Sequence, residues 1–418
     1  MKLLVYSHDA FGLGNIRRMV AICEYLLKAI PGLSILVVSG SPALHQLRLP
    51  EGLDYIKLPC LGRDEAGVLG VRFLRTEPEE TVRLRSELIR TAAAHFQPDV
   101  VLVDKKPDGL KGELQATLDW LQRQRPQTRL VLLLRDILDS PEVTITQWQQ
   151  NNYYALAETH YDQVWIVGTR DIFDAPQEYQ FSSTLRAKTR FMGYVRRGQG
   201  LRTPQEVRQS LGLTAAQPLV LVTPGGGGDG YRLVDSYLQS LAAMPADFNL
   251  ASLIIGGPEM PAHQKQSLLS RVQANPALHW LDFTDDLASF MVAADVVVSM
   301  GGYNTVGEIL SLRKRAVVVP RTQPVEEQWI RAKRMAELGL FAAIHPDQLT
   351  PQVLAQAIRQ ELCQSARDTQ AGSESASSPG FWSFADYVLD LNALPRITEA
   401  MLGLLLSRSV CLAEPIAV

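Results

Sequence analysis

The chain has 418 residues and a net charge of −3, with 46% hydrophobic and 20% charged residues. This length exceeds one ordinary hydrophobic core, so we expect a soluble globular protein of two domains. The small negative charge excludes a global attraction to nucleic acid or to an anionic bilayer, and leaves only local basic patches for such partners.

The four cysteines are scattered and form no Cys-x-x-Cys pair. This spacing argues against a zinc site and a disulfide framework, and favours a reducing compartment. The apolar run at the start is too short for a signal peptide, and no unbroken apolar run reaches the ~20 residues of a membrane-spanning helix. We therefore expect a cytoplasmic protein without a transmembrane segment.

Short, nearly all-apolar runs alternate with amphipathic segments through the first half of the chain. Such runs are typical of strands that are covered on both faces of a parallel sheet. Segment 15–30 repeats apolar residues every three or four positions, as one face of a helix does. Repeated strand–helix units predict a doubly wound sheet. The strands expected here are 2–7, 34–40, 54–59, 99–104, 129–136 and 163–169.

The alternation stops in the polar, basic stretch 193–217 and then restarts. We therefore expect two α/β domains, 1–195 and 217–363, joined by a linker at 196–216. The strands expected in the second half are 218–224, 251–257, 279–283, 295–300 and 316–320.

The C-terminal part of the chain changes in composition. After a last helix near 351–362, stretch 364–380 is rich in Ser, Ala and Gly and predicts a flexible loop. Residues 381–418 regain a helical pattern and predict a C-terminal tail that can pack back on the body.

Residues that follow the strands are the candidates for a site, because ligands of open α/β sheets bind beyond the carboxyl ends of the strands. In the first such loop, "SHDAFGLGNIRR" (7–18), Gly12 and Gly14 allow a tight turn before a helix whose N–H groups suit an anion. A dinucleotide fingerprint is not matched, because Arg17 replaces the third glycine and the second strand ends in Ser39 instead of an acid. The arginine pair that ends this loop suits an anionic ligand or is simply solvated.

Four consecutive glycines in "VTPGGGGDG" (222–230) follow the first strand of the second domain. Nothing in the sequence indicates a packing role for these four glycines, and ordering glycines costs conformational entropy. The pattern favours a backbone that approaches a phosphate closely over a floppy connector.

A third loop reads "MGGYNTVGEIL" (300–310). Its two glycines let the backbone turn sharply, and Asn304 or Thr305 is expected to cap the helix that follows. Glu308 comes three residues after Thr305. It therefore either completes a capping box or accepts hydrogen bonds from the two hydroxyls of a ribose.

A fourth loop, "VVVPRTQPVEEQ" (317–328), ends in Glu326, Glu327 and Gln328. These side chains suit the hydroxyls of a sugar. They are equally typical of the acidic first turn of a helix, which the helix dipole favours.

Together and in this order, the motifs resemble those of the GT-B glycosyltransferases, and within them the MurG-like, family 28-like group of bacterial enzymes. "GLGNIRR" resembles the N-terminal glycine loop of that group, and "PGGGGDG" its second glycine loop. "MGGYNTVGEIL" followed by "VVVPRTQPVEEQ" resembles its nucleotide-sugar signature. The resemblance implies two doubly wound Rossmann-like domains with parallel sheets facing across a cleft, and a metal-independent hexosyltransferase without a cofactor beyond its donor.

The resemblance also implies roles for residues. The donor, a nucleotide diphosphate sugar with UDP favoured by analogy, would bind the second domain, and the acceptor would enter from the loops of the first. Glu308 would hold the ribose, and the diphosphate would be bound by Gly302, Asn304 and Thr305. The phosphate or sugar would contact Gly226 and Gly227, and the transferred sugar would contact Glu327 and Gln328. The N-terminal loop of the same site would be formed by Gly12, Gly14 and Asn15.

One position departs from the group. Related enzymes often carry His directly after the glycine loop, where this chain has Asn15. An amide takes no proton, so an inverting transfer needs another general base. A retaining mechanism, which needs no such base, stays open. Asp104 and Asp136 also have a structural interpretation, in which they cap a helix or pair with Lys105 and Arg135. The candidate bases, in order, are Asp9, His8, Asp136 and Asp104.

Two other functions are compatible with these motifs. A nucleotide-sugar 2-epimerase shares the fold, and Asn15 motivates a non-catalytic nucleotide-sugar-binding protein. The expected partner is a small nucleotide sugar, with no nucleic acid. The acceptor stays open between a lipid-linked molecule and a small metabolite, and peripheral membrane contact through the first domain stays open with it.

Overall fold

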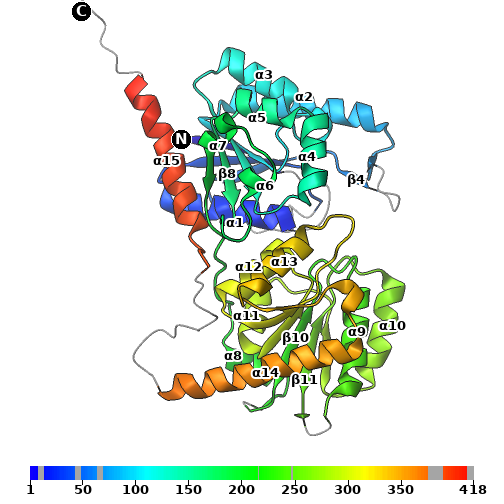
Figure 1. Cartoon of the computed structure of the whole chain (residues 1–418). Helices are drawn as coiled ribbons and strands as arrows, with labels where there is room; N and C mark the ends of the chain where they lie inside the picture. Colours follow the sequence, from blue (N-terminus) through cyan, green and yellow to red (C-terminus); the bar gives the residue numbers. More distant parts are fainter. Residues whose placement is uncertain are drawn as a thin grey trace, which may run out of the picture. The chain divides into compact units, whose positions relative to one another are not determined.

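A computed structural model of the chain (Figure 1) describes residues 1–7, 14–42, 49–63, 69–214, 216–245, 248–374 and 389–411. It divides into two compact units. Unit 1 comprises Met1–Val195 and Asp390–Val418, and unit 2 comprises Arg196–Leu389. Among the helices that the structure describes, none combines the length and the hydropathy needed to cross a membrane.

Unit 1 is built on a seven-stranded parallel sheet with the order β3-β2-β1-β6-β7-β8-β9. Its inner strands are buried on both faces, which is why they read as continuous apolar runs. The order reverses between β1 and β6. The strands are β1 Lys2–Ser7, β2 Ser34–Ser39, β3 Leu53–Lys57, β6 Val100–Asp104, β7 Arg129–Arg135, β8 Gln163–Val167 and β9 Thr189–Phe191, with a separate hairpin of β4 Leu61–Arg63 and β5 Leu69–Val71.

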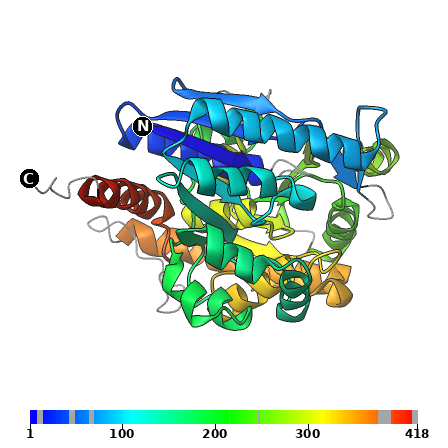
Figure 2. The ribbon, with the colours of Figure 1, turned by 90° about the horizontal axis from the view of Figure 1, so that it is seen from above.

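Helices connect these strands. α2 and α3 lie side by side (Figure 2), and α1 lies beside the C-terminal helix α15 (Figure 1). α15 buries Ile397 and Met401 completely, so the C-terminal tail belongs to unit 1. The helices are α1 Gly14–Ala29, α2 Pro78–Phe96, α3 Gln115–Gln124, α4 Pro141–Gln150, α5 Tyr153–His160, α6 Ala175–Glu178, α7 Ser183–Lys188 and α15 Ala393–Cys411, with a 3-10 turn η2 at Leu110–Gly112.

Unit 2 has a six-stranded parallel sheet with the order β12-β11-β10-β13-β14-β15. The order reverses between β10 and β13, which is where ligands bind in doubly wound sheets. The strands are β10 Leu219–Thr223, β11 Ala251–Ile255, β12 Leu278–Leu281, β13 Val296–Ser299, β14 Arg315–Val318 and β15 Ala342–Ala343. The helices are α8 Pro204–Ser210, α9 Tyr231–Ser240, α10 Ala262–Gln273, α11 Leu287–Ala293, α12 Tyr303–Ser311, α13 Glu327–Glu337 and α14 Pro351–Glu374, with 3-10 turns η3 Leu241–Ala243 and η5 Pro346–Gln348.

Two segments differ from the sequence-based expectations. The expected linker 196–216 contains α8, which begins with a capping box at Thr203 and packs on α11 inside unit 2. The helix expected near 351–362 continues to Glu374, so it enters the segment 364–380 for which we expected a loop. The remainder of that segment lies outside the described residues.

Candidate functional site

The loop after β10 (residues 224–230, here the second glycine loop) packs against the loop after β11. A Cβ atom on Gly227 would overlap the carbonyl oxygen of Gly256, and Gly227 has a φ of +91°. The N–H of Glu259 donates to the carbonyl of Gly226 at 2.8 Å. The expectation that these glycines have no packing purpose is therefore wrong for Gly227, which is needed where two backbones approach closely.

Replacing Gly227 with alanine is expected to destabilise unit 2. The positive φ alone costs ~1–3 kcal/mol for a residue with a Cβ, and the overlap with Gly256 adds to it. Gly228→Ala is the matched control, because a Cβ there would meet nothing closer than 3.8 Å. Urea unfolding of both variants measures the difference. Equal stabilities would show that the contact between the two loops does not require Gly227.

The loop after β14 meets the second glycine loop and the turn after β13. Nη1 of Arg321 lies 3.0 Å from Oδ2 of Asp229 in the second glycine loop. The backbone N–H of Arg321 donates to Oε1 of Gln328 at 3.2 Å. Nε2 of Gln328 lies 4.0 Å from the position of a Cβ on Gly302. Loops that follow β10, β13 and β14 are thus joined in one place, at the carboxyl edge of the sheet.

Helix α12 begins at this place without a side-chain cap. Its N-cap is Gly302, and no side chain hydrogen-bonds the cap position. Asn304 and Thr305 therefore lie inside the first turn and do not cap it, and Glu308 lies too deep in the helix for a capping box. The capping interpretation of Glu308 is wrong. The first N–H groups of a helix lack intrahelical partners, and they offer a site for an anion.

The turn before α12 is held by α13. The buried Arg331 donates from Nη1 to the carbonyl of Gly301 at 3.3 Å, and its guanidinium lies 5.6 Å from the ring centroid of Tyr303. Its Nη2 lies 3.7 Å from Oε2 of Glu327. Glu327, which the resemblance assigns to the transferred sugar, is only 4% exposed. The structure thus gives Glu327 a structural role: it pairs with the arginine that fixes the turn.

Arg197 joins this site, although no sequence pattern pointed to it. Its Nη2 donates to Oδ1 of Asn304 at 2.6 Å, and its backbone N–H donates to Oγ of Ser311 at 2.9 Å. The residue lies in the stretch 193–217 that we expected to be partly linker. A basic residue at that point was visible in the sequence, but its contact lies 107 residues further along the chain. Arg197 places a cation at the N-terminal turn of α12, where an anion would bind.

Two of the candidate bases lie deep in unit 1. Asp104 is fully buried, and its Oδ1 accepts a hydrogen bond from Nη2 of Arg18 at 2.7 Å. Asp136 accepts from the N–H of Ile137 and from the hydroxyl of Tyr194, both at 2.8 Å, and is 1% exposed. A general base must reach the hydroxyl of its substrate, so this burial speaks against both carboxylates.

The pair of Asp104 with Arg18 corrects the expectation for Arg18, the second of the two N-terminal arginines. Arg18 is 1% exposed and paired with Asp104, so it is neither solvated nor turned to a ligand. Gly14 begins α1, and the half-buried Asn15 follows it in the first turn. The remaining predicted residues of this loop, His8, Asp9 and Gly12, lie outside the described residues.

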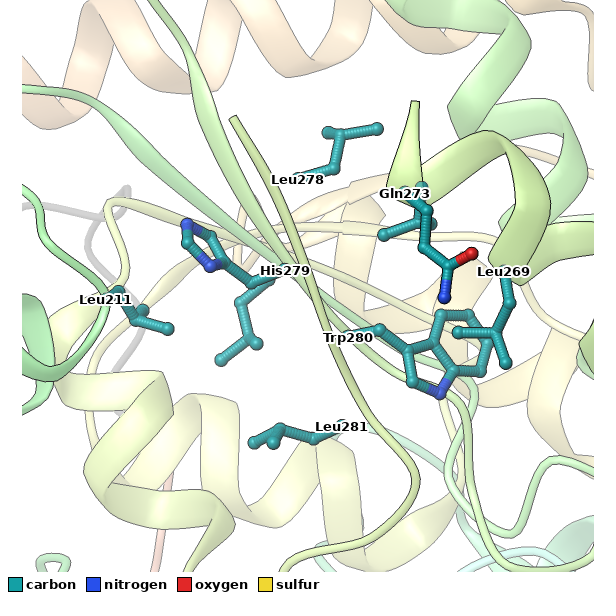
Figure 3. A pocket seen from close by; sticks show the side chains of 9 residues that line it. Leu211, Leu269, Gln273, Leu278, His279, Trp280 and Leu281 are labelled. Carbon is teal, nitrogen blue, oxygen red and sulfur yellow. The ribbon is translucent and has the colours of Figure 1, made fainter. Parts of the chain in front are cut away.

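A hollow of about 430 Å³ lies along the edge strand β12. Figure 3 shows Trp280 and Leu269 on one side of the strand and His279 with Leu211 on the other. None of the predicted site residues lines it. Among the described side chains, no group of three His, Cys, Asp or Glu residues is arranged to hold a metal ion. The candidate site is therefore the junction of loops at α12.

Comparison with known families identifies the part of the chain that carries this junction. Residues 220–385 match the model of the glycosyltransferase family 28 C-terminal domain. This part of the chain is therefore similar to the C-terminal domain of glycosyltransferase family 28. The junction of loops after β10, β13 and β14 lies within the matched residues.

Curated relatives agree with the family. An uncharacterized glycosyltransferase of Methanopyrus kandleri is 29% identical over 167 residues, which are 40% of this chain and 44% of the relative. The UDP-N-acetylglucosamine–N-acetylmuramyl-(pentapeptide) pyrophosphoryl-undecaprenol N-acetylglucosamine transferase of Acidothermus cellulolyticus is 29% identical over 134 residues, 32% of this chain and 36% of the relative. The chain thus spans less than half the length of these two relatives.

Solved structures share the fold over nearly the whole chain. MurG of Acinetobacter baumannii superposes with a TM-score of 0.58 at 15% identity, covering 96% of this chain and 99% of that one. A glycosyltransferase of Rickettsia africae gives a TM-score of 0.62 at 13% identity, covering 97% and 98%. The expected GT-B fold, with two Rossmann-like parallel-sheet units, and the expected likeness to the MurG-like, family 28 group are confirmed.

Proposed function

We propose that the chain is a glycosyltransferase that moves a sugar from a nucleotide diphosphate sugar to an acceptor. The observation that carries this proposal is the junction of the loops after β10, β13 and β14 at the uncapped N-terminus of α12. The junction lies inside the residues that match the family 28 C-terminal domain. An uncapped helix N-terminus with a cation beside it is suited to a diphosphate.

The residues of the junction have the following proposed roles. The N–H groups at Gly302, Asn304 and Thr305 bind the diphosphate, and Arg197 adds a positive charge there. Glu308 on α12 accepts hydrogen bonds from the ribose hydroxyls. Gln328, held by the N–H of Arg321, meets the sugar. When the bond to the sugar breaks, the helix N-terminus and Arg197 stabilise the charge that builds on the leaving diphosphate.

UDP is the proposed nucleotide, because the names of several relatives specify UDP-N-acetylglucosamine. The proposal includes no bound metal, so turnover should persist in EDTA. His8 or Asp9 remains the proposed general base of an inverting transfer, since Asp104 and Asp136 are buried and paired.

A lipid-linked acceptor is the acceptor class that unit 1 favours. Of the nine exposed large hydrophobic side chains among the described residues, four lie within residues 73–88, between the end of β5 and the middle of α2. A contiguous exposed apolar surface marks an interaction site, and we propose that these side chains contribute to one that contacts a lipid. These side chains are Phe73, Leu74, Leu84 and Leu88, with exposures of 66%, 46%, 46% and 37%.

The proposal is tested by turnover with UDP-, GDP-, dTDP- and CDP-sugars, each with and without a bacterial lipid extract in detergent. Release of the nucleoside diphosphate, stimulated by the extract, is the expected result. Inversion at C2 of the sugar without release would indicate an epimerase. Saturable binding without either reaction would indicate a binding protein, and the absence of binding to all four donors would contradict the donor site itself.

A further inference from the structure

Arg321 connects two of the loops that form the junction to the start of α12. It follows β14, and its Nη1 lies 3.0 Å from Oδ2 of Asp229 in the second glycine loop. Its backbone N–H donates to Oε1 of Gln328 at 3.2 Å, and Nε2 of the same amide lies 4.0 Å from the position of a Cβ on Gly302. Arg321 is therefore linked to the second glycine loop through its side chain, and to the N-cap of α12 through Gln328.

The guanidinium of Arg321 has more donors than the structure uses. A guanidinium carries five N–H donors. Among the described residues, the side chain of Arg321 donates to Asp229, and its buried Nε meets no acceptor. A buried N–H without an acceptor is unfavourable, because it has lost its hydrogen bond to water. A ligand that brings further acceptor oxygens to this guanidinium is therefore favoured.

The ion pair of Arg321 with Asp229 is of a kind that a ligand can replace. The two side chains are 35% and 48% exposed. Solvent screens such a pair, so it contributes little to stability. A diphosphate carries more negative charge than one carboxylate, and its oxygens match the planar donors of a guanidinium. The exchange of Asp229 for a diphosphate thus gains more than it loses.

The neighbours of Arg321 indicate which of the two phosphates it meets. In the proposed function, Glu308 binds the ribose and Gln328 meets the sugar. The ribose of a nucleotide sugar is attached to the α-phosphate, and the sugar to the β-phosphate. Because the N–H of Arg321 binds the side chain of Gln328, Arg321 lies at the sugar end of the donor. The β-phosphate is therefore the nearer of the two.

We propose that Arg321 exchanges Asp229 for the β-phosphate when the donor binds, and so adds a second cation to the diphosphate site in addition to Arg197. This inference rests on the proposed function and refines it. Asp229 is then an internal competitor of the donor, because it holds the guanidinium until the β-phosphate takes its place. When the bond to the sugar breaks, Arg321 stabilises the charge that builds on the β-phosphate.

The test compares the binding of UDP with that of UMP, which lacks the β-phosphate, in calorimetric titrations of the full chain. The matching pair replaces them if another base is the preferred donor. The variants are Arg321→Gln, Asp229→Asn and the two combined. Arg334→Gln is the control, because it removes an exposed arginine from the last turn of α13.

Arg321→Gln should weaken the binding of UDP about tenfold, the loss expected for a charge-assisted hydrogen bond, and change that of UMP less than about twofold. Asp229→Asn should tighten the binding of UDP about twofold to fivefold, the range for an exposed ion pair, because the competitor is gone. Combined with Arg321→Gln, Asp229→Asn should lose most of this gain, since there is no longer a guanidinium to release. Arg334→Gln should change the binding of neither ligand.

Two results would overturn the inference while leaving the donor site in place. One is an Arg321→Gln variant that binds UDP as wild type does, or that weakens UDP and UMP equally. The other is a gain from Asp229→Asn that is the same with and without Arg321→Gln, because Asp229 would then act only by repelling the ligand. Failure of wild type to bind UDP or any other nucleoside diphosphate would instead contradict the proposed function.

Discussion

Replacing Glu308 with alanine is expected to weaken the binding of UDP and of the UDP-sugar alike, by about 100-fold or more. Two charge-assisted hydrogen bonds to ribose hydroxyls are lost, each contributing ~1.5–3 kcal/mol, and every 1.4 kcal/mol is about tenfold in affinity. The variant loses no helix cap, because the N-cap of α12 is Gly302. The effect should therefore appear in ligand titrations and not as a broken helix.

The ligand can be altered as well as the protein. Removing the 2′-hydroxyl of UDP should cost wild type much of this affinity and cost Glu308→Ala nearly none, because the hydroxyl has lost its acceptor. In a double-mutant cycle that combines Glu308→Ala with removal of the hydroxyl, the non-additivity of the two losses in binding free energy measures the contact between the carboxylate and that hydroxyl. Glu337→Ala, an exposed carboxylate on α13, serves as the control. Equal losses for 2′-deoxy-UDP in wild type and Glu308→Ala would show that the carboxylate does not touch the ribose.

The strands of both sheets were predictable because a strand that is buried on both faces is apolar at nearly every residue. β6 and β10 are buried at every residue, and they read as continuous apolar runs. The junction at α12 was predictable in part, since ligands bind where the strand order reverses and glycines mark sharp turns there. The contacts that build the junction were not, because they join residues far apart in the chain.

Glu308 illustrates what a local pattern leaves undecided. The sequence "T-x-x-E" reads as a capping box if the helix begins at Thr305, and as ordinary helix interior if it begins at Gly302. Only the backbone decides, and the N-cap is Gly302. Gly227 is a second example, because glycine is needed there only on account of the carbonyl oxygen of Gly256 on another loop, which the local sequence does not reveal.

Charged side chains were the least predictable, because their partners are chosen by tertiary structure. Arg18 pairs with Asp104 over 86 residues, and Arg197 with Asn304 over 107. Neither pair lies on one helix or one hairpin, so no spacing rule could indicate it. The sequence supplied the residue types at the strand ends, and folding decided which of them remained accessible to a ligand.

Replacing Glu113 with alanine is expected to destabilise unit 1 by ~3–5 kcal/mol, the cost of leaving a buried partner charge uncompensated. Glu113 is fully buried and binds Arg85 of α2 through two hydrogen bonds of 2.5 and 2.6 Å. It also accepts from the hydroxyl of Tyr6 at 2.6 Å. Burial, with the Glu113 charge beside it, raises the pKa of Tyr6 well above its usual value, so the phenol stays protonated as the donor.

Urea unfolding separates the charge from the packing. Arg85→Met combined with Glu113→Leu removes both charges and fills similar volume, so it should recover most of the stability that Glu113→Ala loses. Arg85 also donates to the carbonyl of Pro59, and the double variant forfeits that bond. If the double variant is no more stable than Glu113→Ala, the loss comes from packing and backbone contacts. If it recovers, the loss in Glu113→Ala comes from leaving the charge of Arg85 without its partner, and apolar packing alone holds α2, which carries the exposed Leu84 and Leu88.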